Sequence, residues 1–167
     1  MDNFYEQLEN IEKPTNYKII KGVMYGFGVI ALLCLTTALI IPCIFSIIVA
    51  AAAFFSKKKA YVEYEYVFTN GVIDVDAIYE QRKRKRLLSF DAKDMELLAE
   101  TNSNYVKDFS NKPDKELSCF KSKTTEIVYV AMITGGVERL QFIFTPDKRF
   151  LDLCYKYNPR AVKRDMR

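Results

Sequence analysis

Residues 22–56 read GVMYGFGVIALLCLTTALIIPCIFSIIVAAAAFFS, thirty-five positions without a charged side chain. An apolar run well beyond eighteen residues is typical of membrane-spanning segments, because every backbone amide in hydrocarbon must find its partner within its own helix. The sequence therefore predicts a membrane protein. It indicates where the chain lies more clearly than what the chain does there.

This apolar run is too long for a single straight crossing. One helix of this length would extend roughly 50 Å, at about 1.5 Å per residue, against a hydrocarbon core of about 30 Å. Pro42 lies in the middle of the run, where its ring opposes a continuous helix but suits the first turn of a new one. We therefore predict a transmembrane helical hairpin over residues 17–59, with a tight turn between Leu39 and Pro42. One tilted span or a re-entrant loop is the alternative.

Lysines on both sides of the run predict its orientation. Three of them precede the run and three follow it: Lys13, Lys18, Lys21, Lys57, Lys58 and Lys59. Because lysines beside a span tend to stay in the cytoplasm, this arrangement favours an even number of crossings. The predicted location is the cell membrane, with two spans and both termini in the cytoplasm.

The remaining chain divides into two parts. Residues 1–16 are predicted to form a short amphipathic helix, because Phe4, Leu8 and Ile11 recur at helical spacing before Pro14. Residues 60–167 have the length of one ordinary domain and are predicted to lie in the cytoplasm.

Small residues occur in both predicted spans. Gly22 and Gly26 have the GxxxG spacing that lets helices approach closely, and Gly28 follows. In a hairpin they would lie at the same depth as Ala50 and Ala53 of the second span, so we favour packing of the two spans on each other. Homodimerisation through the glycine face is the alternative.

From Ala60 onward the apolar pattern changes to a period of two, which is typical of half-buried strands. Thr69-Asn70-Gly71 predicts a tight turn between the first two strands. Two later strands are predicted over residues 126–134 and 137–145, joined by Gly135-Gly136, whereas residues 101–118 are predicted to form a long loop.

The last predicted element is an amphipathic helix capped by Thr145. One of its faces is apolar and consists of Phe150, Leu153, Cys154 and Tyr157. The predicted fold class is therefore α+β, with a transmembrane helical hairpin followed by an antiparallel β-barrel or sheet and a capping C-terminal helix.

Composition excludes several classes of function. The chain has no histidine, so the commonest general base and the commonest zinc ligand are both absent. The four cysteines have no metal-ligand spacing, and we predict neither a metal nor a cofactor. A net charge of +4 is too mild to indicate nucleic-acid binding. No nucleophile or phosphate cradle accompanies the acidic residues, so we predict neither an enzyme nor a small-molecule substrate.

The stretch from Tyr64 through Ala99, which includes EYVFTNGVIDVDAIYEQRKRKRLLSFDAKDMELLA, resembles the start of bacterial pleckstrin-homology-like (PH-like) domains. The double span, the TNG turn and the RKRKR run together are also similar to a family of small bacterial membrane proteins without an assigned function. This resemblance implies a β-barrel capped by the C-terminal helix, and it supplies no catalytic residues.

One charged segment is dense enough to suggest a role, and it comprises Arg82, Lys83, Arg84, Lys85 and Arg86. Together with Lys57, Lys58 and Lys59 these residues are candidates for binding lipid headgroups or other anions, at about 1 kcal/mol per cation near an anionic surface. The alternative, which we weigh about equally, is that the run is a charged connection or strand edge that keeps the strands from pairing with other chains.

The sequence thus favours a non-enzymatic, membrane-anchored adaptor. Its predicted partners are the lipid bilayer and a protein, either of another kind or a second copy of this chain. A peripheral module that senses anionic lipid through Arg82 to Arg86 is the alternative.

Overall fold

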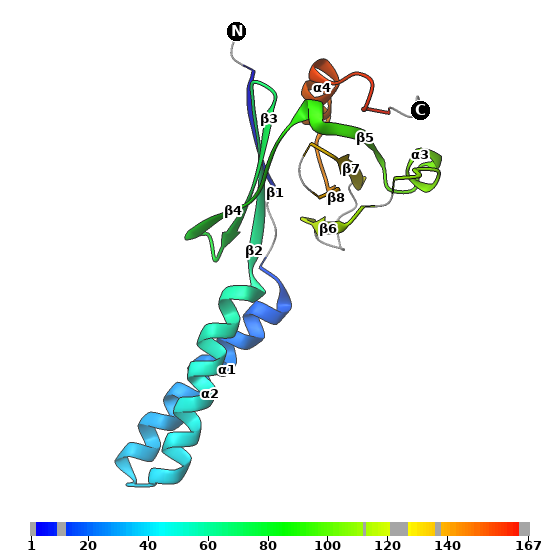
Figure 1. Ribbon diagram of the computed structural model, residues 1–167. Helices are drawn as coiled ribbons and strands as arrows, with labels where there is room; N and C mark the ends of the chain where they lie inside the picture. The colour runs from blue at the N-terminus through cyan, green and yellow to red at the C-terminus, as the bar shows by residue number, and fades with distance from the viewer. Residues whose placement is uncertain (1–2, 10–12, 112, 121–126, 136–137, 164–167) are drawn as a thin grey trace. The chain divides into compact units, whose positions relative to one another are not determined.

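A computed structural model describes residues 3–9, 13–111, 113–120, 127–135 and 138–163 (Figure 1). The chain is α+β, with a helical hairpin, mixed β-sheets and a C-terminal helix. It forms two compact units. The hairpin unit comprises residues 10–63 and 78–84, and the sheet unit comprises residues 1–9, 64–77 and 85–167.

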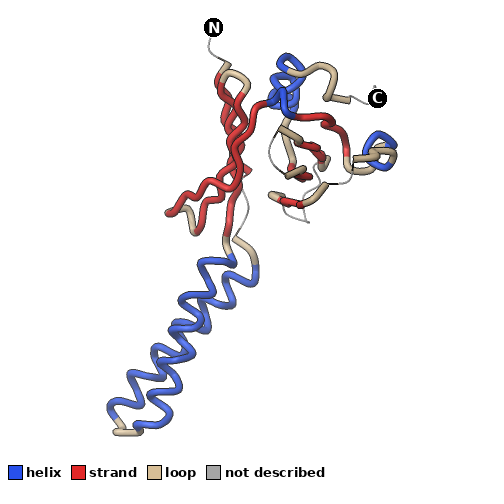
Figure 2. The backbone as a smooth tube through the Cα atoms, viewed as in Figure 1, coloured by secondary structure: helices blue, strands red, loops and turns tan. Residues whose placement is uncertain are grey.

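Two apolar helices dominate the hairpin unit, α1 (Thr15–Thr36) and α2 (Ile40–Ala60), which run side by side (Figure 2). Ala31 is buried on α1, and Phe27 contacts Phe45 of α2 with ring centroids 6.5 Å apart. Each helix is long and apolar enough to cross a membrane, and only 11% of its most apolar window is buried within the chain. Most of the apolar helix surface therefore has no cover from the protein itself.

The predicted helical hairpin is confirmed, with a small shift of its turn. The turn is Thr37 to Leu39, and Pro42 lies in the first turn of α2, where its missing N–H costs nothing. Both helices are longer than the apolar run suggests, because α1 begins before the run and α2 continues through the three lysines.

The amphipathic helix predicted at the N-terminus is wrong, because the structure has a strand there, β1 (Phe4–Glu9). This strand pairs antiparallel with β2 (Val62–Thr69), with Phe4 opposite Thr69 and Glu9 opposite Tyr64. Pairing with β2 satisfies the backbone of so short a segment better than an isolated helix does. Ile11, which was part of the helical prediction, lies outside the described residues.

In the described part of the chain, the first sheet has the order β1-β2-β3-β4, with β3 at Val72–Tyr79 and β4 at Lys83–Asp91. The predicted turn between β2 and β3 is confirmed. Asn70 and Gly71 both have positive φ, 50° and 102°. Glycine is required at the second position, because a Cβ atom there would lie 2.8 Å from the Tyr157 ring.

The second sheet has the order β5-β7-β8-β6 among the described residues. Its strands are β5 (Met95–Glu100), β6 (Lys115–Ser118), β7 (Tyr129–Ile133) and β8 (Leu140–Phe144). β7 and β8 are antiparallel, as predicted, although Gly136 of the predicted turn lies outside the described residues.

Residues 101–118 are not the predicted structureless loop, and the sheet is not purely antiparallel. This segment contains the short helix α3 (Asn104–Lys107) and β6, which pairs parallel to β8. A four-residue edge strand of sequence KELS carries too weak an apolar signal to predict.

The C-terminal helix α4 (Lys148–Tyr157) is preceded by its N-cap, Asp147, whose Oδ1 accepts a hydrogen bond of 2.8 Å from the Phe150 N–H. Asp147 rather than Thr145 is therefore the cap. The predicted apolar face is confirmed, because Phe150 and Cys154 are buried in the main core. That core includes an aromatic cluster of Tyr66, Phe68, Phe142, Phe144 and Phe150.

Candidate functional site

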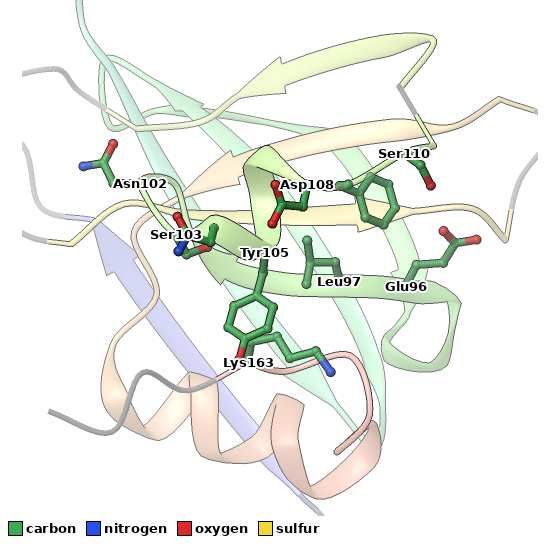
Figure 3. Close-up of a pocket in the computed structure, with 10 residues that line it drawn as sticks. Glu96, Leu97, Asn102, Ser103, Tyr105, Asp108, Ser110 and Lys163 are labelled. Atoms are coloured by element: carbon green, nitrogen blue, oxygen red, sulfur yellow. The ribbon is translucent and has the colours of Figure 1, made fainter.

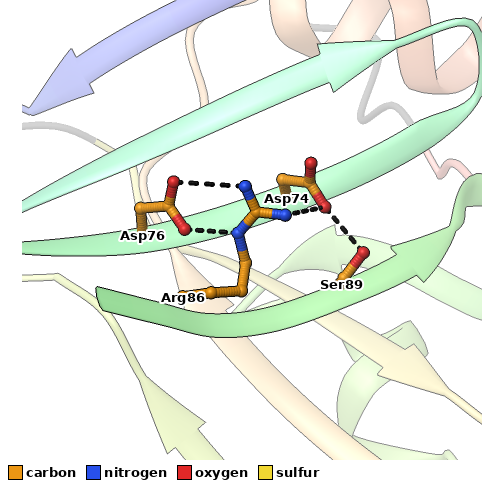
Figure 4. Close-up of polar contacts among 4 residues, drawn as sticks. All are labelled: Asp74, Asp76, Arg86 and Ser89. Atoms are coloured by element: carbon orange, nitrogen blue, oxygen red, sulfur yellow. Dashed lines mark hydrogen bonds and ion pairs between the residues drawn. The ribbon is translucent and has the colours of Figure 1, made fainter. Parts of the chain in front are cut away.

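The predicted basic run forms the first part of β4 and the turn before it, and its residues do not act as one patch. Arg86 lies against two carboxylates of the neighbouring strand β3 (Figure 4). Its Nη1 is 2.7 Å from Asp74 Oδ1, and its Nε donates to Asp76 Oδ1. Ser89 Oγ completes the cluster with a 2.6 Å hydrogen bond to Asp74.

This cluster has the character of a structural ion pair. The Asp76 side chain is only 3% exposed, so its charge requires a partner. The hydrogen bond to Asp76 raises the pKa of Arg86, which keeps the guanidinium charged. The Arg86 guanidinium already pairs with Asp74 and Asp76 within the chain, and its binding of an external anion stays a prediction. Arg84 also interacts with other residues of the chain.

The turn that precedes β4 is unusual in its residue types. The Arg82 N–H donates to Tyr79 O at 3.0 Å, and the two residues between them, Glu80 and Gln81, have φ of 49° and 57°. Two-residue turns of this kind strongly prefer Asn-Gly. Each residue other than glycine in this conformation costs about 1–2 kcal/mol. Such strain persists only where the surroundings hold the backbone in place.

Both turn residues are held by their side chains within the hairpin unit. Glu80 Oε1 lies 3.5 Å from Lys57 Nζ of α2 and accepts a 3.3 Å hydrogen bond from Tyr17 Oη of α1. The Glu80 N–H also donates to Tyr61 O at 3.0 Å. One carboxylate thus joins the start of α1, the end of α2 and the turn.

Gln81 is anchored through a second carboxylate. Its Nε2 donates to Glu63 Oε1 at 3.0 Å, and Tyr61 Oη donates to the same oxygen at 2.6 Å. Burial of Tyr61, followed by its bond to Glu63, raises the pKa of this phenol to about 12. Tyr61 therefore remains a hydrogen-bond donor throughout the physiological range. We call Glu63, Glu80 and Gln81, with Lys57, Tyr17 and Tyr61, the anchoring network.

The other predicted anion-binding residues lie at the end of α2. Lys57 is half-buried and committed to Glu80, whereas Lys58 and Lys59 are exposed. The Lys58 ammonium lies 4.9 Å from the centre of the Phe54 ring and 5.5 Å from that of Phe55. The structure therefore separates the eight predicted cations into those used internally and those that face outward.

The predicted packing of the glycines on α2 is wrong. A Cβ atom added at Gly22, Gly26 or Gly28 would meet nothing within 4 Å, so none of the three is in close contact with α2; Gly22 and Gly26 are exposed, whereas Gly28 is half-buried. Helical phase explains this, because the half-buried α1 positions lie on the opposite side from Gly22 and Gly26. On α2, Ala53 is buried and Ala50 half-buried, as close packing requires. Homodimerisation through the glycine face remains a prediction.

The exposure of Gly26 and the burial of Ala53 predict different effects when each residue is replaced by a larger one. Gly26→Ile should leave the pairing of α1 and α2 intact, whereas Ala53→Leu should separate the helices and cost roughly 1–3 kcal/mol through overpacking. Disulfide trapping between cysteines placed across the two helices measures the effect. Equal trapping in both variants would contradict the described helix faces.

Sequence reasoning missed an open hollow of about 770 Å³ in the sheet unit, beside α3 (Figure 3). Its lining combines apolar and charged side chains, among them Leu97, Phe109, Tyr105, Glu96, Asp108 and Lys163. Ser103 Oγ is buried here and makes no hydrogen bond within the described residues. The sequence did not predict this hollow because residues 101–118 have the polar composition of a loop.

Three acidic residues of β3 and the turn after it are partners of cations. Asp74 and Asp76 bind Arg86, and Glu80 binds Lys57. Over the described ranges, no group of three or more acidic or cysteine side chains is arranged to hold a metal ion.

A helical hairpin with mixed sheets and a C-terminal helix defines a small α+β protein. The profile of the bacterial PH-like domain family DUF6106 matches residues 1–164, and the chain belongs to this family. The match includes α1 and α2, so the helical hairpin is part of the family's own architecture. No curated protein and no solved structure matches the chain.

Proposed function

We propose that this protein is a non-enzymatic adaptor, anchored in the cell membrane by α1 and α2, whose PH-like domain binds a protein partner at the inner membrane face. The uncovered apolar surface of the two helices supports the anchoring. The lysines on both sides of the helices support a cytoplasmic position for both termini.

The observation that carries the partner-binding proposal is the orientation of β1. Its apolar side chains point outward, with Phe4 57% and Leu8 47% exposed. Its inward positions carry hydrogen-bonding groups: Gln7 Nε2 donates to Thr145 O at 2.8 Å, and Tyr5, whose side chain packs against the core, donates to Asp147. Ordinary sheets have the reverse arrangement, with apolar residues inside.

This orientation gives β1 the properties of a binding surface. It is an edge strand of the first sheet among the described residues, and edge strands readily pair with other chains. Burying Phe4 and Leu8 against a partner would contribute about 1.5–3 kcal/mol each. An extended segment of another protein, added beside β1, would use both the strand edge and these side chains.

Photo-crosslinking in intact cells tests the proposal. A benzoylphenylalanine at position 4 or 8 should give a membrane-bound adduct heavier than the chain, and the same probe in place of the exposed Lys93 should give none. An adduct of twice the chain's mass would identify the partner as a second copy. Absence of adducts at both positions would contradict partner binding through β1.

The orientation is tested separately by thiol labelling. In a variant without the native cysteines, Thr15→Cys and Asn111→Cys should react with an impermeant reagent only after the cells are opened. Reaction of position 111 in intact cells would place the sheet unit outside and contradict the proposed location.

A further inference from the structure

The positive charge of the chain is concentrated in the hairpin unit. Residues 10–63 and 78–84 contain nine Lys and Arg and three Glu, a net charge of +6, whereas the whole chain has +4. The rest of the chain therefore has a net charge of −2. Because residues 22–56 contain no charge, six of the nine cations lie at one end of the helical hairpin, and the other three lie in the turn between β3 and β4 and the first two residues of β4.

The anchoring network fixes that turn to the same end of the two helices. Glu80 reaches both Lys57 and Tyr17, and Gln81 reaches Glu63. The side chains of the two turn residues therefore point toward the hairpin unit and anchor the turn, instead of pointing into solvent. The next two residues, Arg82 and Lys83, remain exposed.

Three exposed cations of the hairpin unit have no acidic partner among the described residues. In the part of the chain that the structure describes, Lys59, Arg82 and Lys83 make no ion pair, in contrast to Lys57 and Arg86. A cluster of unpaired cations beside an apolar hairpin is complementary in charge to the phosphate layer of an anionic membrane. Asn-Gly would form this turn with less strain, so the presence of Glu80 and Gln81 indicates that their side chains are needed to anchor it.

We propose that the end of α2 and the β3–β4 turn form a contact surface for the phosphate groups of anionic phospholipids, with Lys59, Arg82 and Lys83 as the contacting residues. Glu80 and Gln81 are positioning residues, which keep Arg82 and Lys83 at the level of the headgroups. This inference rests on the proposed membrane anchoring of α1 and α2.

Lipid quenching in the full chain tests the inference. The protein has no tryptophan, so Phe55→Trp, at a position 66% exposed near the end of α2, provides a single fluorophore. The protein is reconstituted in phosphatidylcholine vesicles that contain brominated phosphatidylglycerol or brominated phosphatidylcholine. The ratio of quenching by brominated phosphatidylglycerol to quenching by brominated phosphatidylcholine gives the association constant of the anionic lipid relative to phosphatidylcholine.

In this background, Arg82→Gln with Lys83→Gln should lower the relative association constant severalfold, up to about 30-fold if both cations act at full strength. The matched control, Lys93→Gln with Lys107→Gln, removes two exposed cations from the sheet unit and should leave the constant unchanged. Equal constants in the two variants would overturn the proposal.

A second variant separates positioning from net charge. Glu80→Asn with Gln81→Gly retains the turn type but removes both anchors and one negative charge. A simple charge effect would increase the preference for phosphatidylglycerol, whereas our proposal predicts that most of it is lost. An increased preference would overturn the role of the anchors.

Two further measurements distinguish lipid phosphate from soluble phosphate, and failure of this inference from failure of the proposed membrane anchoring. Millimolar inorganic phosphate should act no more strongly than sodium chloride of equal ionic strength, and a specific loss would assign the site to soluble phosphate instead. Quenching by both lipids without preference would contradict only this inference. Absence of quenching by either lipid would contradict membrane anchoring and both proposals with it.

Discussion

Phe150→Ala is expected to lower the free energy of unfolding of the sheet unit by about 3–5 kcal/mol, the range for large-to-small changes at a fully buried aromatic residue. Phe150 has no exposed surface. Its ring packs edge-on against Tyr66, Phe68 and Phe144, with centroids 5.9–6.2 Å apart. The loss would consume a large part of a typical domain stability of about 5–15 kcal/mol.

Urea unfolding of the full chain in detergent micelles, followed by the near-ultraviolet dichroism of its tyrosines, measures this loss. Tyr155→Ala on the same helix is the matched control, because its side chain is 44% exposed. We expect about 1 kcal/mol or less for the control. Similar losses for the two variants would mean that α4 does not cover the core with the face described above.

Arg86→Ala is expected to have the second largest effect, about 2–3 kcal/mol. Removal of Arg86 leaves Asp76 almost fully buried without its cation, a change that typically costs 3–5 kcal/mol. Because Arg86 itself is 51% exposed, solvent screening reduces this figure. The double variant Asp76→Ala with Arg86→Ala should recover part of the loss, since it removes the buried carboxylate together with its cation and leaves only the more exposed Asp74 without one.

The same variant tests how the basic run is divided. Arg86→Ala should lower stability in thermal unfolding but leave the phosphatidylglycerol preference unchanged, whereas Arg82→Gln with Lys83→Gln should do the reverse. If Arg86→Ala removed the lipid preference without affecting stability, the structural assignment of Arg86 would be wrong.

Local signals in the sequence predicted the elements whose determinants lie close together in the chain. The uncharged run and Pro42 predicted the helical hairpin, and Asn70-Gly71 predicted the turn between β2 and β3 by the conformational freedom of those two residues. The apolar spacing of Phe150 and Cys154 predicted the buried face of α4.

Elements that depend on distant partners were not predictable in this way. Phe4 and Leu8 share a face in both a helix and a strand, and only pairing with β2, more than fifty residues later, decides between them. The role of Arg86 depends on the register of β4 against β3, which places it beside Asp74 and Asp76. The turn at Glu80 and Gln81 carries no glycine signal, because its stability comes from side chains of both helices.

The pairing of β1 with β2 has a consequence for biogenesis. The 52 residues 10–61 separate the two strands, so the hairpin is inserted into the connection between paired strands of the sheet. At about 5–20 residues per second, β1 leaves the ribosome roughly 3–10 s before its partner. Both helices of the hairpin are therefore synthesised before β1 can pair with β2, and the first sheet can close only after α1 and α2 are complete.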